Sequence, residues 1–122
     1  MAQVVVSIAD LPLLAPPGRG PIAGRHVFEG QAFGLASLTV VVGESHPGQS
    51  VRLHRHDVDE LIIVYAGRGT YTVGDVTAEA GVGEVVVIPA GVPHRWVNHT
   101  DEPLVHTGVF PTDRFALETV AD

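Results

Sequence analysis

Residues 48–67 read GQSVRLHRHDVDELIIVYAG, and this stretch contains the pattern that decides both the fold and the candidate site. His54 and His56 are two residues apart, and residues two apart on a β-strand point to the same face. Two imidazoles side by side inside a protein are costly unless they have polar partners. The polar turn at 57–59 then leads into Glu60, which opens the apolar run LIIVY. A chain that folds back at this turn brings Glu60 beside the two histidines.

A second stretch, residues 83–98, reads GEVVVIPAGVPHRWVN and supplies a third histidine. Its loop, 89–93, contains two prolines and a glycine and leads directly to His94. Three neutral imidazoles and one carboxylate form a mixed nitrogen and oxygen donor set that suits a divalent transition metal. We therefore predict one divalent ion (Fe, Mn, Ni or Zn), and its expected ligands are His54, His56, Glu60 and His94.

The spacing within both stretches resembles the two motifs of the cupin superfamily, and most closely its small single-domain, type-2 members. Every position of the first motif is filled, by Gly48, His54, His56, Glu60 and Gly67. Every position of the second is filled as well, by Gly83, Pro89, Gly91, His94 and Asn98. The resemblance implies an all-β fold, the double-stranded β-helix or jelly-roll barrel. It also implies the metal-binding role of the four ligands and a structural role in a turn for Asn98.

Short apolar and β-branched runs predict further strands around the motifs. The expected strands are residues 38–42, 51–56, 61–65, 70–73, 76–79, 85–88, 95–98 and 104–110. Gly74 and Asp75 separate two of them and are typical of a tight hairpin. No stretch has helical periodicity over three turns, so the pattern indicates an all-β barrel.

The chain length of 122 residues fits one domain. We expect an irregular N-terminal arm over 1–24, the barrel over 25–112 and a C-terminal tail over 113–122. Residues 40–42, 61–64 and 85–88 are apolar at consecutive positions, which indicates strands covered on both faces. The barrel interior covers one face, and we predict that a second subunit in a homodimer covers the other. The alternative is that the N-terminal arm alone provides this cover.

The charge and composition exclude several classes of function. The net charge is -7, and all seven basic residues are arginines. An acidic surface repels phosphate backbones and anionic lipids, so we expect no nucleic-acid partner and no membrane association. The absence of cysteine excludes disulfides and thiolate metal sites. With no basic segment typical of a signal peptide at the N-terminus, we expect a cytoplasmic location.

Three more residues are candidates for the site. Arg52 shares strand parity with the His-x-His pair and is expected to face inward, either binding a substrate carboxylate or pairing with an acid near the barrel mouth. Trp96 shares parity with His94 and either lines the substrate pocket or packs in the core. His106 is a candidate general acid or base if it faces inward, and otherwise a structural histidine. The remaining arginines are expected to be solvated or at an interface.

Three functions are compatible with this pattern, because a fold does not fix a function. The first is a metal-dependent enzyme that acts on a small organic molecule, including an O₂-using dioxygenase. The second is a non-redox isomerase, lyase, cyclase or rearrangement enzyme of specialised metabolism, in which the metal acts as a Lewis acid. The third is a small-molecule-binding cupin without catalysis. The four expected protein ligands leave coordination positions open on a six-coordinate ion, which favours an enzyme with a small-molecule substrate.

Overall fold

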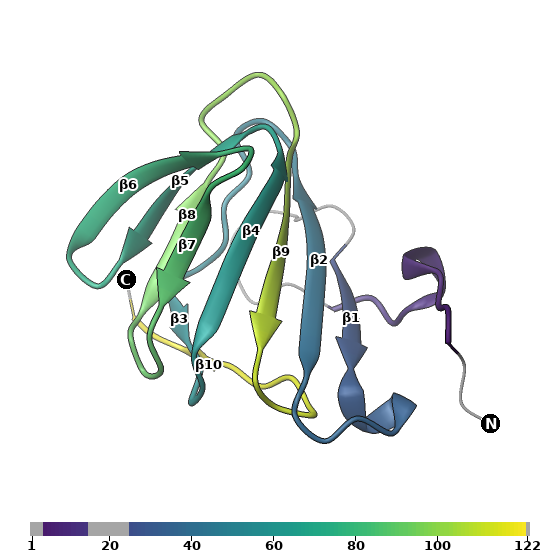
Figure 1. Cartoon of the computed structure of the whole chain (residues 1–122). Coiled ribbons are helices and arrows are strands. Elements are labelled where there is room, and N and C mark those ends of the chain that lie inside the picture. Colours follow the sequence, from purple (N-terminus) through teal and green to yellow (C-terminus); the bar gives the residue numbers. More distant parts are fainter. Residues whose placement is uncertain (1–3, 15–24, 122) are drawn as a thin grey trace.

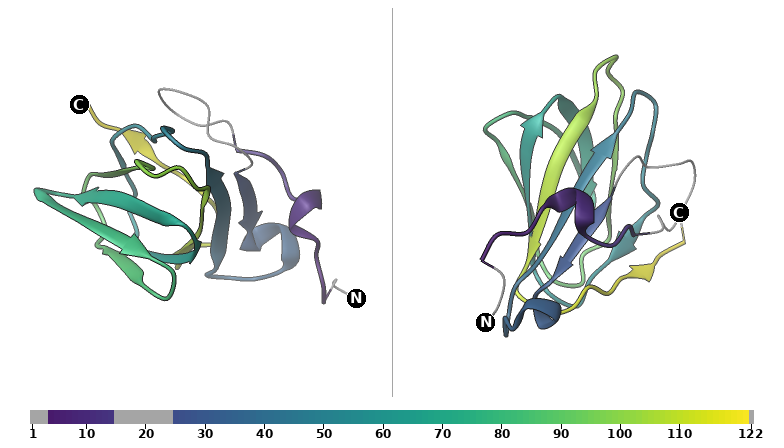
Figure 2. Two further views of the ribbon diagram at one scale, coloured as in Figure 1. Left: turned by 90° about the horizontal axis from the view of Figure 1, so that it is seen from above. Right: turned by 90° about the vertical axis from the view of Figure 1, so that its right-hand side faces the viewer.

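A computed structural model describes residues 4–14 and 25–121, and within them ten strands form two five-stranded antiparallel sheets (Figure 1). Sheet A contains, in spatial order, β1 (His26–Glu29), β2 (Thr39–Ser45), β9 (Leu104–Phe110), β4 (Glu60–Ala66) and β7 (Val85–Ile88). Sheet B contains β10 (Glu118–Thr119), β3 (His54–Arg55), β8 (His94–Val97), β5 (Arg68–Val73) and β6 (Val76–Gly81). The sheets stack face to face, as the view from above shows (Figure 2). The expected all-β fold is therefore confirmed.

The expected strand segments match the observed strands closely on sheet A. β7 and β9 have the expected bounds, and β4 extends the expected 61–65 by one residue at each end. On β2, buried residues alternate with half-buried ones over all seven positions, as in a strand with one face in the core. The two short strands β1 and β10 carried no comparable apolar run and were not expected.

Residues 51–53 differ from the expectation, because they are not in a strand and β3 is limited to two residues. The C-terminal tail adds β10 to the edge of sheet B, where Val120 N–H donates to the Leu53 carbonyl. Val51 and His54 are both buried although they differ in strand parity. Side chains in this irregular segment therefore do not alternate as in a regular strand, and the expectation that Arg52 faces inward, which rested on that alternation, does not apply here.

The connections follow the turn chemistry of the sequence. β5 and β6 form the expected hairpin, with Val73 opposite Val76 and Gly74 in the left-handed region at φ 61°. Gly67 has φ 75°, and a Cβ there would overlap the Pro103 carbonyl. Only glycine satisfies both constraints, which is the physical reason for this motif position.

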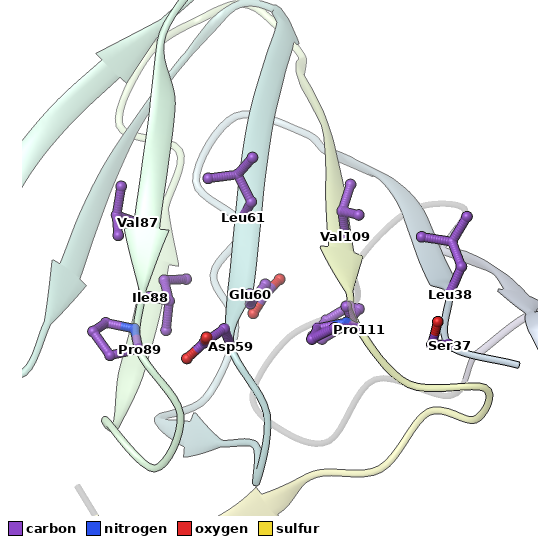
Figure 3. Close-up of a pocket in the computed structure, with 11 residues that line it drawn as sticks. Ser37, Leu38, Asp59, Glu60, Leu61, Val87, Ile88, Pro89, Val109 and Pro111 are labelled. Atoms are coloured by element: carbon purple, nitrogen blue, oxygen red, sulfur yellow. The ribbon is translucent and has the colours of Figure 1, made fainter.

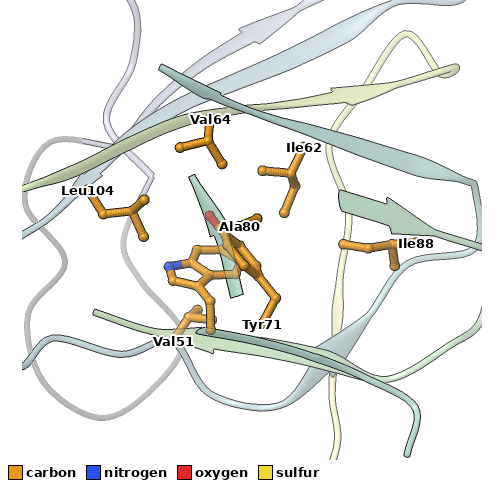
Figure 4. Packing of buried hydrophobic residues seen from close by; sticks show 8 residues of the cluster. Val51, Ile62, Val64, Tyr71, Ala80, Ile88 and Leu104 are labelled. Carbon is orange, nitrogen blue, oxygen red and sulfur yellow. The ribbon is translucent and has the colours of Figure 1, made fainter. Parts of the chain in front are cut away.

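Two apolar clusters fill the interior between the sheets. The larger cluster, shown in Figure 4, consists of Val51, Ile62, Val64, Tyr71, Ala80, Ile88, Trp96 and Leu104. The smaller cluster joins Val27, Val41 and Phe110, with Leu14, Val58 and Phe115 packed against it. Both sheets contribute to the larger cluster, so its packing holds the two sheets together.

The outer face of sheet A is covered over only part of its width. The N-terminal segment 4–14 contains a 3₁₀ helix, Ile8–Asp10, and Val4, Val6, Ile8 and Leu11 line a pocket with the outward side chains of β1 and β2. A second 3₁₀ helix, Gly30–Phe33, follows β1 and adds Phe33 to this pocket. Residues 15–24 of the expected arm lie outside the described residues. Among the described residues, no helix is long and apolar enough to cross a membrane.

On β4, β7 and β9 the outward side chains have no such cover. Leu38, Leu61, Val87 and Val109 lie in a row across this face and line a groove of about 490 Å³ (Figure 3). Leu61 is 40% exposed and Val87 is 68% exposed. Of the three strands expected to be covered on both faces, β2 is covered on its outer side by the N-terminal segment, whereas within the described residues β4 and β7 are covered on their inner side alone.

Candidate metal centre

Four side chains from three parts of the barrel meet at one end of the interior. His54 lies on β3 directly opposite His94, the first residue of β8. His56 follows β3, and the chain then turns at 57–59 and enters sheet A at Glu60, the first residue of β4. The sheet stacking thus brings Glu60 of sheet A against His54 and His94 of sheet B and against His56, which follows β3.

The three imidazoles are close enough to share one ion. One nitrogen from each of His54, His56 and His94 lies within 4.8 Å of the others. The Oε1 atom of Glu60 lies 3.1 Å from Nε2 of His94 and 3.4 Å from Nε2 of His56. All four side chains are buried. The structure therefore brings together the four residues that the motifs predicted as ligands.

Backbone carbonyls fix the orientation and tautomer of each ring. Nδ1 of His54 lies 2.8 Å from the Arg52 carbonyl, Nδ1 of His56 lies 2.7 Å from the Ala116 carbonyl, and Nδ1 of His94 lies 2.9 Å from the Val92 carbonyl. A carbonyl oxygen only accepts, so each Nδ1 must carry the proton and donate it. In a neutral ring this leaves the lone pair on Nε2, which is the arrangement of metal-binding histidines.

The electrostatics of the cluster favour a neutral His54 ring beside an ionised Glu60 carboxylate. Burial, together with the neighbouring His94, lowers the pKa of His54 to about 3. Burial alone would raise the pKa of Glu60, but the hydrogen bonds and positive charge that the His56 and His94 rings offer when protonated outweigh this and lower the pKa to about 2. At neutral pH the cluster therefore presents the negative charge of Glu60 beside the neutral ring of His54.

Two buried atoms without hydrogen-bond partners indicate whether the cluster fits a metal ion. Nε2 of His94 and Oε1 of Glu60 are buried without a hydrogen-bond partner, although they are only 3.1 Å apart. An imidazole lone pair and a carboxylate oxygen repel one another at this distance unless a cation lies between them. The donor set of three nitrogens and one oxygen suits a divalent first-row ion. The residues present therefore fit the predicted metal.

Aromatic side chains and the tail close the site on the His56 side. The ring of His56 is 4.8 Å from that of Phe110 and 5.5 Å from that of Phe115. Phe115 is held by its backbone N–H, which donates to the Glu29 carboxylate. The Ala116 carbonyl that orients His56 belongs to the same tail. The C-terminal tail thus supplies part of the wall of the site.

The second motif's asparagine organises a turn and lies away from the ligands. Asn98 is fully buried, and its amide donates to the carbonyls of Ser45 and Glu102. Its side-chain oxygen accepts from both the backbone N–H and the hydroxyl of Thr100. These four contacts tie β2 to the connection between β8 and β9.

The remaining candidates differ in their placement. His106 is buried and faces inward, with its Nδ1 2.7 Å from the Tyr71 hydroxyl and its ring 4.5 Å from that of Trp96. Burial lowers the pKa of His106 to about 4 and raises that of Tyr71. Trp96 belongs to the larger apolar cluster, and its ring is 6.0 Å from that of His54. Arg52 is half-buried, and its Nε has no hydrogen-bond partner.

Arg25 is the residue near the site that the sequence reasoning missed. It was grouped with the solvated or interface arginines, yet it is 5% exposed and its guanidinium carbon lies 5.7 Å from the centroid of the Trp96 ring. The motifs begin at Gly48, and Arg25 precedes a short strand with no strong pattern. No local signal in the sequence distinguishes it from an exposed arginine.

Comparisons with known proteins agree with this geometry. The family model described as "Cupin domain" matches residues 41–110. The HTH-type transcriptional activator RhaR of Pectobacterium carotovorum is 37% identical over 57 residues, which are 47% of this chain and 20% of that protein. The chain therefore matches only about a fifth of the length of this curated relative.

Two solved structures show the same fold. A variant of the oxalate decarboxylase OxdC of Bacillus subtilis is 20% identical with a TM-score of 0.81, and the match covers 93% of this chain and 31% of that chain. An uncharacterised conserved protein with a double-stranded β-helix domain from Klebsiella pneumoniae is 21% identical with a TM-score of 0.75. That match covers 98% of this chain and 99% of the Klebsiella chain. At these identities the likeness concerns the fold alone.

Proposed function

This chain belongs to the cupin domain family, and on that premise we propose that it is a metal-dependent enzyme acting on a small organic molecule. One observation carries the proposal. The three buried histidines each have a backbone carbonyl at Nδ1, so their Nε2 lone pairs are available beside the orphaned Glu60 oxygen. Orphaned polar atoms in a buried site are costly for the folded chain, and a bound ion accounts for them.

The residues of the chain have distinct roles in this proposal. His54, His56, Glu60 and His94 hold the ion, which when bound supplies a Lewis acid or, if redox-active, an electron-transfer centre for O₂. Phe110 and Phe115 exclude water on the His56 side. The site is buried, so electrostatic interactions within it are strong.

His106 and Tyr71 are proposed to move a proton near the site. The lowered pKa of His106 keeps its imidazole neutral, and the raised pKa of Tyr71 keeps its phenol protonated. A neutral imidazole beside a protonated phenol can accept or return a proton at Nδ1. Trp96 and Arg52 are proposed to contact the substrate, Trp96 through its ring and Arg52 through its half-buried side chain.

Two kinds of chemistry remain within the enzyme proposal. An iron ion would support an O₂-using dioxygenase, and a redox-inert ion would support isomerisation, elimination or cyclisation. A second candidate function is a ligand-binding module without catalysis, and the similarity to the transcriptional activator RhaR supports it. The net charge of -7 argues against direct contact between this chain and DNA.

Elemental analysis of protein purified anaerobically, with and without added Fe(II), tests the proposal. We expect close to one equivalent of a first-row metal per chain. Iron that oxidises in air, with O₂ uptake on addition of candidate substrates, supports the dioxygenase. Air-stable zinc or nickel supports Lewis-acid chemistry, and a chain that binds no divalent metal under any loading condition contradicts the proposal.

We also propose that the chain forms the homodimer expected from its sequence. The supporting observation is the groove on the outer face of sheet A, where the N-terminal segment gives no cover. Apolar side chains in a row across three adjacent strands form the kind of patch that pairs with a copy of itself.

A further inference from the structure

The barrel interior contains a buried arginine, Arg25, which is not one of the four metal ligands. Arg25 immediately precedes β1 and is 5% exposed. Its Nη1 atom is buried without a hydrogen-bond partner in the part of the chain that the structure describes. Arginine is rarely this buried unless it is paired, because removing a guanidinium from water is expensive. The position therefore needs a reason other than stability.

The surrounding strands hold the Arg25 side chain inside the barrel. Gly43 of β2 faces it, and a Cβ at this position would lie 3.0 Å from the Arg25 Cγ. The absence of a side chain on Gly43 is therefore what makes room for the arginine stem. On the other side lies the Trp96 ring, whose Nε1–H donates to the Ser45 hydroxyl at 3.3 Å. A guanidinium over a fixed aromatic ring has a defined orientation.

With a divalent ion bound, the barrel interior has a net positive charge. Burial lowers the pKa of Arg25 to about 10, while the charge of Glu60 opposes this shift, so Arg25 stays protonated at neutral pH. A divalent ion together with Arg25 therefore exceeds the charge of Glu60 by two. In a medium of low dielectric constant such an excess strongly favours an anionic ligand.

We propose that Arg25 binds the carboxylate of the small molecule on which this site acts, which makes the substrate a small organic acid. This inference rests on the proposed function for the location of the reacting centre. The planar fork of a guanidinium matches a carboxylate in a bidentate pair, and the unpartnered Nη1 provides a free donor for it. Arg25 is thus a substrate-positioning residue that determines specificity for acids over neutral analogues.

Trp96 provides a local readout of binding, because it is the only tryptophan of the chain and lies against the Arg25 guanidinium. The experiment titrates the metal-loaded protein with acetate, propionate and benzoate, and with the three corresponding amides, while following tryptophan fluorescence. Each acid and its amide have nearly the same shape and differ in charge. We expect saturable quenching or a spectral shift with at least one acid, and at least about tenfold weaker binding of its amide.

Arg25→Met tests the assignment to this residue. We expect the variant to bind the acid at least about tenfold more weakly, so that the preference for the acid over its amide is reduced. The exposed Arg95→Met is the matched control, since it removes one arginine beside Trp96 in the sequence and should leave acid binding unchanged. Undiminished acid binding in Arg25→Met, or equal binding of acid and amide by the wild type, would overturn the proposal.

Two further measurements separate this role from a structural one. A ligand-free Arg25→Met protein should unfold at the same or a higher temperature than the wild type, because an unpaired buried cation has been removed. Arg25→Lys guards against a variant that does not fold. It keeps the charge without the planar fork, so it should retain the preference for acids with a lower affinity. A lysine variant that binds acids as tightly as the wild type contradicts bidentate binding.

Metal content measured on the same samples distinguishes failure of this inference from failure of the proposed function. If the protein contains no metal but binds acids through Arg25, the role of Arg25 is supported and the proposed metal-dependent enzyme is refuted. A metal-loaded protein that binds acids equally well in Arg25→Met retains the metal site and refutes the inference.

Discussion

The larger apolar cluster and the metal centre share strands, yet their side chains serve opposite purposes. On β4, Glu60 and Ile62 are two residues apart and face the same interior. On β8, the same relation holds for His94 and Trp96. Ile62 contacts apolar neighbours, whereas Glu60 and His94 each keep a buried atom without a hydrogen-bond partner. Within one strand, therefore, a single step of two residues separates a side chain that stabilises the fold from one that is costly to bury.

This comparison indicates how a small barrel divides its interior between stability and function. The apolar cluster joins both sheets and supports the fold without any ligand. Two atoms of the metal centre, Oε1 of Glu60 and Nε2 of His94, gain partners only when an ion is bound. Substitutions in the two regions should therefore affect different measurements, even where the residues are neighbours on one strand.

The largest effect on folding is expected from Ile62→Ala in the apolar cluster. Ile62 is fully buried, and truncating such a side chain costs about 2–5 kcal/mol through lost burial and the cavity left behind. Chemical denaturation of the metal-free protein measures this change. Leu61→Ala is the matched control, because Leu61 is the next residue on the outer face and its truncation should cost under about 1 kcal/mol. Equal costs at the two positions would contradict the assignment of inner and outer faces.

The next effect is expected from His94→Ala in the metal centre. Loss of a partner that only orients a ligand reduces metal affinity about 10–100-fold, so loss of a ligand should exceed about 100-fold, or about 2.7 kcal/mol. Competition with a chelator of known affinity measures the loss. His106→Ala removes a buried imidazole outside the three-histidine group and should keep its metal. Full metal occupancy in His94→Ala would refute the ligand assignment.

The smallest effect on the stability of the chain is expected on the outer face of sheet A. Val87→Ser changes an exposed residue of the groove and should alter the free energy of unfolding of the monomer by about 0.5 kcal/mol or less. The same substitution should weaken the proposed homodimer, which light scattering detects as a fall from twice the chain mass of 12.9 kDa. Val76→Ser, on a valine of similar exposure outside this groove, should leave the mass unchanged. A wild-type chain that is monomeric at all concentrations refutes the dimer.

Much of the fold could be predicted because its signals are local. The runs 85–88 and 104–110 have the length and composition of strands, and they became β7 and β9 with the expected bounds. Gly74 fits its hairpin because the turn needs a positive φ, which is a property of one residue and its neighbours. β1 and β10 escaped prediction because they are short, and pairing with β2 and β3 stabilises them more than any propensity of their own.

The sequence by itself determined which residues could form a metal site. His54, His56, Glu60 and His94 lie at spacings that bring them together in a barrel of this kind, and their chemistry suits a divalent ion. The tertiary structure decided the environment of that site. The Ala116 carbonyl orients His56 across 60 residues of chain, and Phe115 closes the site from the tail.

Arg25 marks the limit of the sequence most clearly. Its residue type indicates a surface position. It is buried only because β1 pairs with β2, which places Gly43 on one side of it, and because sheet B stacks on sheet A, which places Trp96 of β8 on the other. Spacing along a strand is a local property that can be read from the order of residues. Burial results from the packing of segments far apart in the chain, so only the folded molecule reveals which arginine lies inside the barrel.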